Sequence, residues 1–389
     1  VLFRSVLVNS VSTYFMGYKS SIINASQKKY ITTIIQKIFQ FVEVILKTVI
    51  LLYFKAYIVY LLIGIFCNIG NNICQYIITD KMYPYLKSDR HNLPSKEIQH
   101  EIFKNTKAMA LHKIGSVIVT GTDNLIISSF VNIASVGLYS NYMLILNSVG
   151  RFTSMISSTM TASVGNLVAT CDMDKIYRTF RKVAFMNLWI HGFCACCFMT
   201  LLNPFIQLWL GERFVFPIYV VALIVFNKFL FGFREAPIVF RDAMGLFWYD
   251  RYKPLLEVIV NLIVSIVLVQ VIGISGVFLG TICSAIFVCC WIEPYVLFKH
   301  GFHKPLYLYF LQVIPISITI VIITALMFYC EMFLPLNFVG FIGRMIMTCI
   351  GYNVLMFVIY RKCDEYTELK KLVITVISGG YHKIFKRKV

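Results

Sequence analysis

The amino-acid sequence predicts an all-α membrane protein built as a polytopic bundle of transmembrane helices. Hydrophobic residues make up 59% of its 389 residues and charged residues only 14%, and the mean hydropathy is +0.76, which is far from the composition of a soluble globular domain. About eleven apolar segments run along the chain, most of them close to the ~20 residues that cross a bilayer. Helices suit such segments because each satisfies its own backbone polar groups.

The third observation is the distribution of positive charge. If successive links between the segments alternate between two faces, most of the 36 Lys and Arg residues fall on one face, the bias that marks cytoplasmic loops. The opposite face carries Lys55 and Arg213. The cytoplasmic set consists of Lys19, Lys28, Lys29, Lys81, Lys87, Arg90, Lys96, Lys104, Lys107, Lys175, Arg178, Arg181, Lys182, Arg234, Arg241, Arg251, Lys253, Lys299, Lys304 and the basic residues of the tail from Arg361 to Lys388.

This pattern gives the order of the spans. We expect a truncated span at 6–18, then spans at about 31–54, 56–79, 109–131, 136–168, 177–202, 215–244, 255–272, 276–298, 306–330 and 338–360. The polar stretch 80–106 contains SKEIQHEIFKN, which reads as an amphipathic helix at the membrane surface. Pro204 and Gly211 mark a short link after the span at 177–202. Residues 1–5 read as non-native sequence, and we expect the natural chain to begin upstream.

Composition and motifs exclude several classes of function. The net charge of +18 lies next to apolar spans, so we expect contact with anionic membrane lipids and no nucleic-acid partner. The twelve cysteines form no metal or disulfide framework, and Cys194, Cys196 and Cys197 cluster inside one span. We expect no metal and no cofactor. No catalytic triad or phosphate-binding loop occurs in a usable context, and the outer links are too short for a catalytic domain.

The span at 109–131 carries a polar stripe on an otherwise apolar helix. Its members, which share one helical face, are Lys113, Ser116, Thr120, Asp123, Asn124 and Ser128. Ionisable groups at membrane depth are costly unless they face protein or water. The stripe therefore faces either a cavity or a polar partner helix, and a Lys or Asp that merely ties two helices together is the alternative.

Two further spans carry charge. Arg151 lies near the middle of the span at 136–168, where a guanidinium needs an anion such as Asp123 or the phosphate of a ligand. Arg234-Glu235 and Arg241-Asp242 are seven residues apart near the end of the span at 215–244, so the arginines share a face and the acids an adjacent one. Lys228 extends this row and favours a cavity wall over a juxtamembrane cluster. His191 is expected to be structural.

Several segments together resemble a known family. They are GTDNLIISSFVNIASVGLYSNYMLI (121–145), TASVGNL (161–167), FRDAMGLFWYDRYKP (240–254) and, more weakly, YKSSIINASQKKY (18–30). In this order they resemble the polysaccharide-transporter branch of the multidrug/oligosaccharidyl-lipid/polysaccharide flippase superfamily, which contains the O-antigen and capsule-unit flippases. The resemblance implies a two-lobed, MATE-like fold of which about three N-terminal helices are missing.

The resemblance also implies the domain organisation. Residues 1–107 would be the remainder of the first lobe, 108–300 the second lobe with six spans, 301–361 an additional helix pair and 362–389 a basic cytoplasmic tail. The implied location is the bacterial inner membrane, with the C-terminus in the cytoplasm.

The implied activity is the flipping of polyprenyl-pyrophosphate-linked oligosaccharides, by a transporter and not an enzyme, with a polysaccharide polymerase as a possible partner. Cationic Lys113, Arg151, Arg234 and Arg241 would hold the pyrophosphate and sugar, while Asp123, Glu235 and Asp242 would balance charge or carry a coupling ion. The alternatives are a lipid II flippase or a cation-coupled drug exporter of the same superfamily, and, from another class, a membrane polysaccharide polymerase or ligase.

Overall fold

The structure, a computed structural model, describes residues 21–23, 26, 28–54, 57–87 and 94–367. The span predicted at 6–18 and most of the basic tail lie outside these residues. The chain divides into two compact units, Val1–Gln99 and His100–Val389, and each is described by itself. The predicted division into lobes, helix pair and tail stays a prediction.

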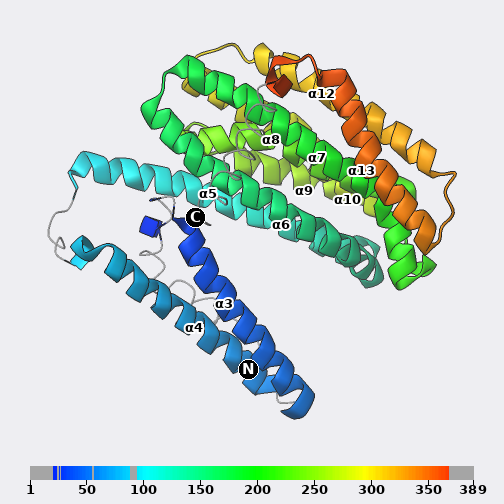
Figure 1. The fold of residues 1–389 in the computed structure, drawn as a ribbon, viewed down its shortest axis with the longest axis horizontal. Helices are drawn as coiled ribbons and strands as arrows, with labels where there is room; N and C mark the ends of the chain where they lie inside the picture. The colour runs from blue at the N-terminus through cyan, green and yellow to red at the C-terminus, as the bar shows by residue number, and fades with distance from the viewer. Residues whose placement is uncertain (1–20, 24–25, 27, 55–56, 88–93, 368–389) are drawn as a thin grey trace, which may run out of the picture. The chain divides into compact units, whose positions relative to one another are not determined.

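The first unit is a helical hairpin (Figure 1). Helix α3 (Lys29–Val49) continues into the π-helical turn η1 (Ile50–Phe54), and α4 (Tyr57–Met82) returns toward the short 3-10 helix η2 (Pro84–Lys87). Glu43 and Lys47 pair one turn apart at 2.5 Å. The Lys47 ammonium also lies 4.7 Å from the ring centre of Tyr60 on α4, so the ion pair of α3 packs against the second helix.

The second unit holds the remaining helices. In chain order they are α5 (Lys96–Ile126), η3 (Ile127–Val131), α6 (Ile133–Thr170), α7 (Met173–Leu210), η4 (Glu212–Phe214), α8 (Ile218–Ala243), η5 (Leu246–Trp248), α9 (Lys253–Ile272), α10 (Ile274–Ser284), η6 (Ala285–Cys289), α11 (Cys290–Val296), η7 (Leu297–Phe302), α12 (Tyr307–Glu331) and α13 (Phe338–Tyr360). The elements from α10 to η7 follow one another without a break and form one long apolar helix, Ile274–Phe302.

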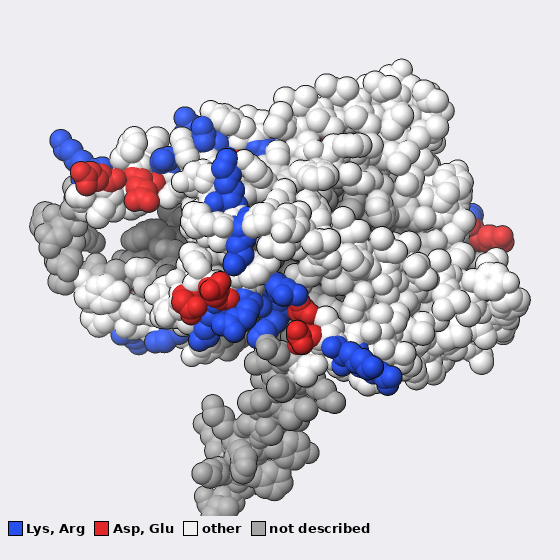
Figure 2. Space-filling model, turned by 90° about the horizontal axis from the view of Figure 1, so that it is seen from above, with Lys and Arg blue, Asp and Glu red and all other residues white. Residues whose placement is uncertain are grey.

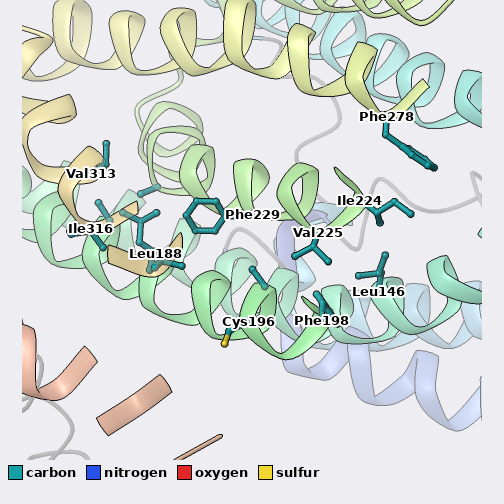
Figure 3. Packing of buried hydrophobic residues seen from close by; sticks show 14 of the residues in the cluster. Leu146, Leu188, Cys196, Phe198, Ile224, Val225, Phe229, Phe278, Val313 and Ile316 are labelled. Atoms are coloured by element: carbon teal, nitrogen blue, oxygen red, sulfur yellow. The ribbon is translucent and has the colours of Figure 1, made fainter. Parts of the chain in front are cut away.

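The hydrophobic core of the second unit forms where α6, α7, α8, α10 and α12 meet. In Figure 3, Leu146 of α6, Phe198 of α7 and Val225 of α8 lie close together, with Phe278 of α10 facing the same region. Phe180, at the start of α7, is fully buried beside Phe240, Phe298 and Tyr309. Such aromatic clusters bury large apolar areas and fix helix positions.

Seven helices in the described part of the chain have the length and apolar composition of membrane spans. They are Tyr57–Met82, Lys96–Val131, Met173–Leu210, Lys253–Ile272, Ile274–Phe302, Tyr307–Glu331 and Phe338–Tyr360. Helices α3, α6 and α8, which are not among these seven, coincide with the other predicted spans. No strand occurs among the described residues, so the all-α prediction is confirmed, and the chain is a multi-pass membrane protein.

Two predicted boundaries are wrong. The amphipathic segment and the span after it form one helix, α5, with Ile98, Ile102 and Phe103 exposed, because nothing in the sequence between them breaks a helix. The link predicted at Pro204 is helical, and α7 continues through Pro204 to Leu210. A proline removes only one backbone hydrogen-bond donor. Inside a membrane bundle, neighbouring helices and side chains can satisfy the carbonyl group that is left without its partner. Gly211, at φ 99°, ends the helix instead.

Helices α9 and α10 pack as a tight pair. Gly273 joins them at φ 60°, a conformation that glycine adopts without strain. A Cβ on Gly276 would lie 2.3 Å from the carbonyl carbon of Leu268, and one on Gly280 would lie 2.0 Å from Ser265 Oγ. Small residues allow this close approach, so α9 and α10 hold each other at backbone distance.

The last two helices are attached to α7 by buried polar contacts. The Thr348 hydroxyl of α13 lies 3.1 Å from Thr200 Oγ1 of α7 and donates to the Glu331 carboxylate of α12. One turn further along α13, Tyr352 donates to the backbone carbonyl of Trp189 on α7 at 3.1 Å. Hydrogen bonds of this kind replace the hydrophobic driving force that helices lack in lipid.

Candidate functional site

Four charged side chains form a buried network between α8, α9 and α11. Arg234 donates from Nε and Nη2 to the two oxygens of Glu293, at 2.9 and 2.7 Å. Lys253 Nζ lies 2.7 Å from Glu293 and 2.8 Å from Glu257, and Glu257 also approaches Arg234 at 3.7 Å. We call these residues, Arg234, Lys253, Glu257 and Glu293, the Arg234 network.

The Arg234 network is electrically balanced. It contains two cations and two carboxylates, and Glu293 is 1% exposed. A bidentate guanidinium–carboxylate pair is among the strongest charge-assisted contacts, and buried charges need such pairing to offset the loss of water. Lys253 lies in the first turn of α9, where the helix dipole disfavours a cation, and the two carboxylates compensate for that position.

A second buried network lies beside it. Arg241 donates to Asp242 from Nε at 3.0 Å and from Nη2 at 2.7 Å, and its Nη1 donates to Asp250 in the link between α8 and α9. Asp250 also lies 3.0 Å from Nε2 of His112 on α5. These four residues, Arg241, Asp242, Asp250 and His112, form the Arg241 network, which fastens α5 to the end of α8.

Glu235 faces away from both networks. Its Oε2 lies 2.5 Å from Nε2 of His191 on α7. His191 is therefore partnered, as expected of a structural histidine. A Cβ on Gly232, one turn away on α8, would lie 2.2 Å from His191 Cβ, so this pair sits where α7 and α8 are close.

Asp123 lies in a cluster of buried oxygen atoms. Thr281 Oγ1 of α10 is 3.4 Å from Asp123 Oδ1 and 3.3 Å from the carbonyl of Val277, and Asn261 of α9 donates its amide to Thr281 at 3.1 Å. Asn261 is fully buried, and its Oδ1 has no hydrogen-bond partner. Oxygen atoms of this kind suit a small hard cation or a proton.

The remaining predicted cations are exposed on the second unit. Lys113 on α5 and Arg151 on α6 are exposed, and neither has a carboxylate within 4.0 Å among the described residues. Ser116, Thr120 and Asn124 are exposed as well. The predicted stripe of α5 is thus divided, since Asp123 turns inward to Thr281 and the other polar groups face outward. The pairing of Arg151 with Asp123 does not form.

Sequence reasoning found Arg234, Arg241, Glu235 and Asp242 but missed their partners. Glu257 and Glu293 are single acids inside the apolar helices α9 and α11, and the rule that flags charges at membrane depth would have selected both. Asp250 carries no such signal, because it lies in the link between α8 and α9, whereas the same rule would have selected His112, which lies within α5. On the face seen in Figure 2, Lys and Arg gather with a few Asp and Glu over part of the surface, and most of the rest of that face carries no charge.

The site offers charge and hydrogen bonds, and the described residues contain no group of three or more His, Cys, Asp or Glu that could hold a metal ion. The substrate-binding role of Lys113, Arg151, Arg234 and Arg241 and the balancing role of Asp123, Glu235 and Asp242 stay predictions. The structure brings Arg241 and Asp242 together, and it keeps Lys113 and Arg151 apart from all of the acids named.

Comparison with known proteins gives one informative match. No protein-family model matches the chain, and no curated protein matches it. The fold is similar to the solved structure "Lipid II flippase MurJ, inward closed conformation", with a TM-score of 0.55 and 17% identity over 92% of this chain and 74% of that chain. At this identity the similarity establishes the fold, and the predicted flippase-type helical fold is confirmed.

Proposed function

We propose that this protein is a flippase, which moves a lipid carrying a phosphate-linked saccharide between the leaflets of a membrane. The observation that carries the proposal is the pair of exposed cations, Lys113 and Arg151, in two predicted spans, neither of which has a carboxylate within 4.0 Å among the described residues. An ionised group on such a helix must face water or an anion. A phosphate headgroup supplies that anion, and the similar fold of a lipid II flippase supports this class of cargo.

For the cargo we propose a polyprenyl-pyrophosphate-linked oligosaccharide repeat unit, moved outward across the bacterial inner membrane, with a polysaccharide polymerase taking up the product. The resemblance of 121–145, 161–167 and 240–254 to the polysaccharide-transporter branch supports this choice. Lipid II is the second candidate, supported equally by the fold. Both share the polyprenyl pyrophosphate, so the cations serve either cargo.

The proposal gives the cations different tasks. Lys113 and Arg151 meet the pyrophosphate directly, because no carboxylate in the described part of the chain pairs with them. Arg234 and Arg241 would reach it only by exchanging Glu293 or Asp250 for a phosphate, so they would act in a later conformation. Glu235 and Asp242 would keep the charge of α8 balanced during that exchange.

For Asp123 we propose the coupling role, as the carrier of a proton or a small monovalent cation. The unpartnered Oδ1 of Asn261 supports it, because a fully buried amide oxygen without a donor is costly. A proton or a cation bound to Asp123 would offset the cost of the buried carboxylate.

Cross-complementation separates the two cargoes. We expect the full-length gene to restore surface glycan in a strain that lacks its repeat-unit flippase and to leave a strain depleted of its lipid II flippase unable to grow. The reverse result would transfer the assignment to lipid II. Rescue of neither strain, with the protein inserted and stable, would overturn the proposal.

The residues are tested in the complementing strain. Arg151→Glu and Lys113→Glu should each abolish surface glycan while membrane insertion stays normal, and Lys175→Glu, at an exposed basic position at the start of α7, should leave glycan unchanged. Glycan at parental levels in both charge-reversal variants would contradict the role of these cations.

Asp123→Asn should abolish the dependence of flipping on ion or proton gradients, measured in vesicles; an unchanged dependence would exclude Asp123 as the carrier.

A further inference from the structure

The link between α8 and α9 carries a tryptophan whose ring is contacted by two cations. The Nζ of Lys104, from α5, lies 4.7 Å from the ring centre of Trp248. The guanidinium of Arg251 lies 4.1 Å from the same ring and 4.6 Å from that of Tyr252, and it donates to the Trp248 carbonyl at 2.7 Å. We call Lys104, Trp248, Arg251 and Tyr252 the aromatic–basic rim.

The positive charge of this rim is not neutralised. Lys104 and Arg251 have no carboxylate within 4.0 Å in the part of the chain that the structure describes. Only a few residues away, Arg241 and Lys253 are each paired with two acids. Aromatic faces attract cations but leave their charge intact, so the rim presents free positive charge where the neighbouring buried groups present none.

The rim also lies at the depth of a membrane boundary. Helix α8 ends at Ala243 and α9 begins at Lys253, so the link lies between the end of the span predicted at 215–244 and α9, which has the length and composition of a span. Tyr252 is 59% exposed and Tyr249 is 54% exposed, and the Tyr249 ring stacks on His300 at 4.0 Å. Exposed Trp and Tyr side chains are typical of the headgroup region of a bilayer, and the charge asymmetry of the sequence assigns this end to the cytoplasm.

We propose that the aromatic–basic rim is a binding site for the headgroup of an anionic phospholipid of the cytoplasmic leaflet. The phosphate would lie between Lys104 and Arg251, where charge is complementary, while Trp248 and Tyr252 would contact the glycerol and upper acyl region. A free phosphate ion would use only the charges and leave the half-buried Trp248 and the exposed Tyr252 without a partner. A lipid uses both, and the inference does not depend on the identity of any transported cargo.

The position of the rim links the lipid to the interior. Asp250, which belongs to the Arg241 network, lies in the chain between Trp248 and Arg251. The side chain of Asp250 contacts His112 on α5, and Lys104 is on the same helix. A bound headgroup would therefore connect α5 with the α8–α9 link at the surface, through Lys104 and Arg251. Asp250 and His112 connect the same two segments in the interior.

Local quenching of Trp248 tests the site. A variant with Trp189, Trp209 and Trp291 changed to Phe retains Trp248 as the single tryptophan. It is reconstituted in phosphatidylcholine vesicles with increasing fractions of brominated phosphatidylglycerol or brominated phosphatidylcholine. We expect half-quenching by the phosphatidylglycerol at a roughly 25-fold lower fraction, since each of the two basic residues contributes about a fivefold preference for anionic lipid.

The controls identify the groups. Lys104→Gln with Arg251→Gln should remove the preference, whereas Lys175→Gln with Arg178→Gln, exposed basic residues at the start of α7, should retain it. Raising salt from about 0.1 M to about 1 M should also reduce it, because the Debye length falls from about 10 Å to about 3 Å. Added inorganic phosphate at constant ionic strength should not displace the lipid.

Several results would overturn the inference: equal quenching by the two brominated lipids, a preference that persists without Lys104 and Arg251, or displacement by inorganic phosphate.

A second measurement uses the chain with all four tryptophans, in detergent. Short-chain phosphatidylglycerol should raise its melting temperature more than phosphatidylcholine does, and the Lys104→Gln/Arg251→Gln variant should lose that difference. An equal rise in parent and variant would count against the site.

Discussion

Replacement of Glu293 by Gln tests whether the Arg234 network stabilises the fold through charge balance. The carboxylate accepts two hydrogen bonds from Arg234, at 2.9 and 2.7 Å, and pairs with Lys253 at 2.7 Å. Glu293→Gln leaves two buried cations that share Glu257 alone. Removal of one partner from a buried ion pair costs about 3–5 kcal/mol, so we expect the free energy of unfolding to fall by that amount.

The double variant Glu293→Gln/Lys253→Gln separates charge balance from the loss of contacts. It restores neutrality, because Arg234 and Glu257 remain, and we expect it to lose less free energy of unfolding than Glu293→Gln alone. The assay is reversible unfolding by SDS in mixed micelles, followed by circular dichroism. Glu212→Gln, at an exposed acid with no ion pair among the described residues, serves as the control and should change stability by less than about 0.5 kcal/mol. A loss below about 1 kcal/mol for Glu293→Gln, or an equal loss in the double variant, would refute the reasoning.

Two further predictions use the same assay. Gly232→Ala should cost about 1–3 kcal/mol, because its Cβ would lie 2.2 Å from His191 Cβ, whereas Gly150→Ala, which has no neighbour within 4 Å, should be neutral or slightly stabilising; equal effects would show that α7 and α8 can separate at no cost. Thr348→Val removes the hydroxyl that donates to the buried Glu331 and should cost about 1–3 kcal/mol; parental stability in this variant would mean that another group can satisfy Glu331.

The helices could be predicted from sequence because their signal is local. A run of about 20 apolar residues identifies a span wherever it packs, and the span predicted at 338–360 coincides with α13. The errors concerned the ends. Pro204 was expected to break α7, but a proline in a membrane helix loses only one hydrogen bond, and its neighbours in the bundle hold the helix together.

The partners of the charged residues could not be predicted, because pairing depends on packing between distant segments. Arg234 and Glu293 are separated by 59 positions, and no periodic pattern connects them. For Asp123 the sequence offered Arg151 as a partner, and the structure shows Thr281 instead. Helical spacing shows that polar residues share one face of the helix. It does not show which of them is buried, and in α5 the buried residue is Asp123.

The neutrality of the Arg234 network has a consequence for the response of the protein to voltage. The two positive and two negative charges of the network lie close together and sum to zero. If α8, α9 and α11 move as a unit, these four charges therefore contribute no electrical work across the membrane potential. An unpaired Arg151 differs, because one elementary charge that crosses a full potential of 100 mV exchanges about 2.3 kcal/mol with the field. Membrane voltage would therefore act on α6 and leave the Arg234 network unmoved.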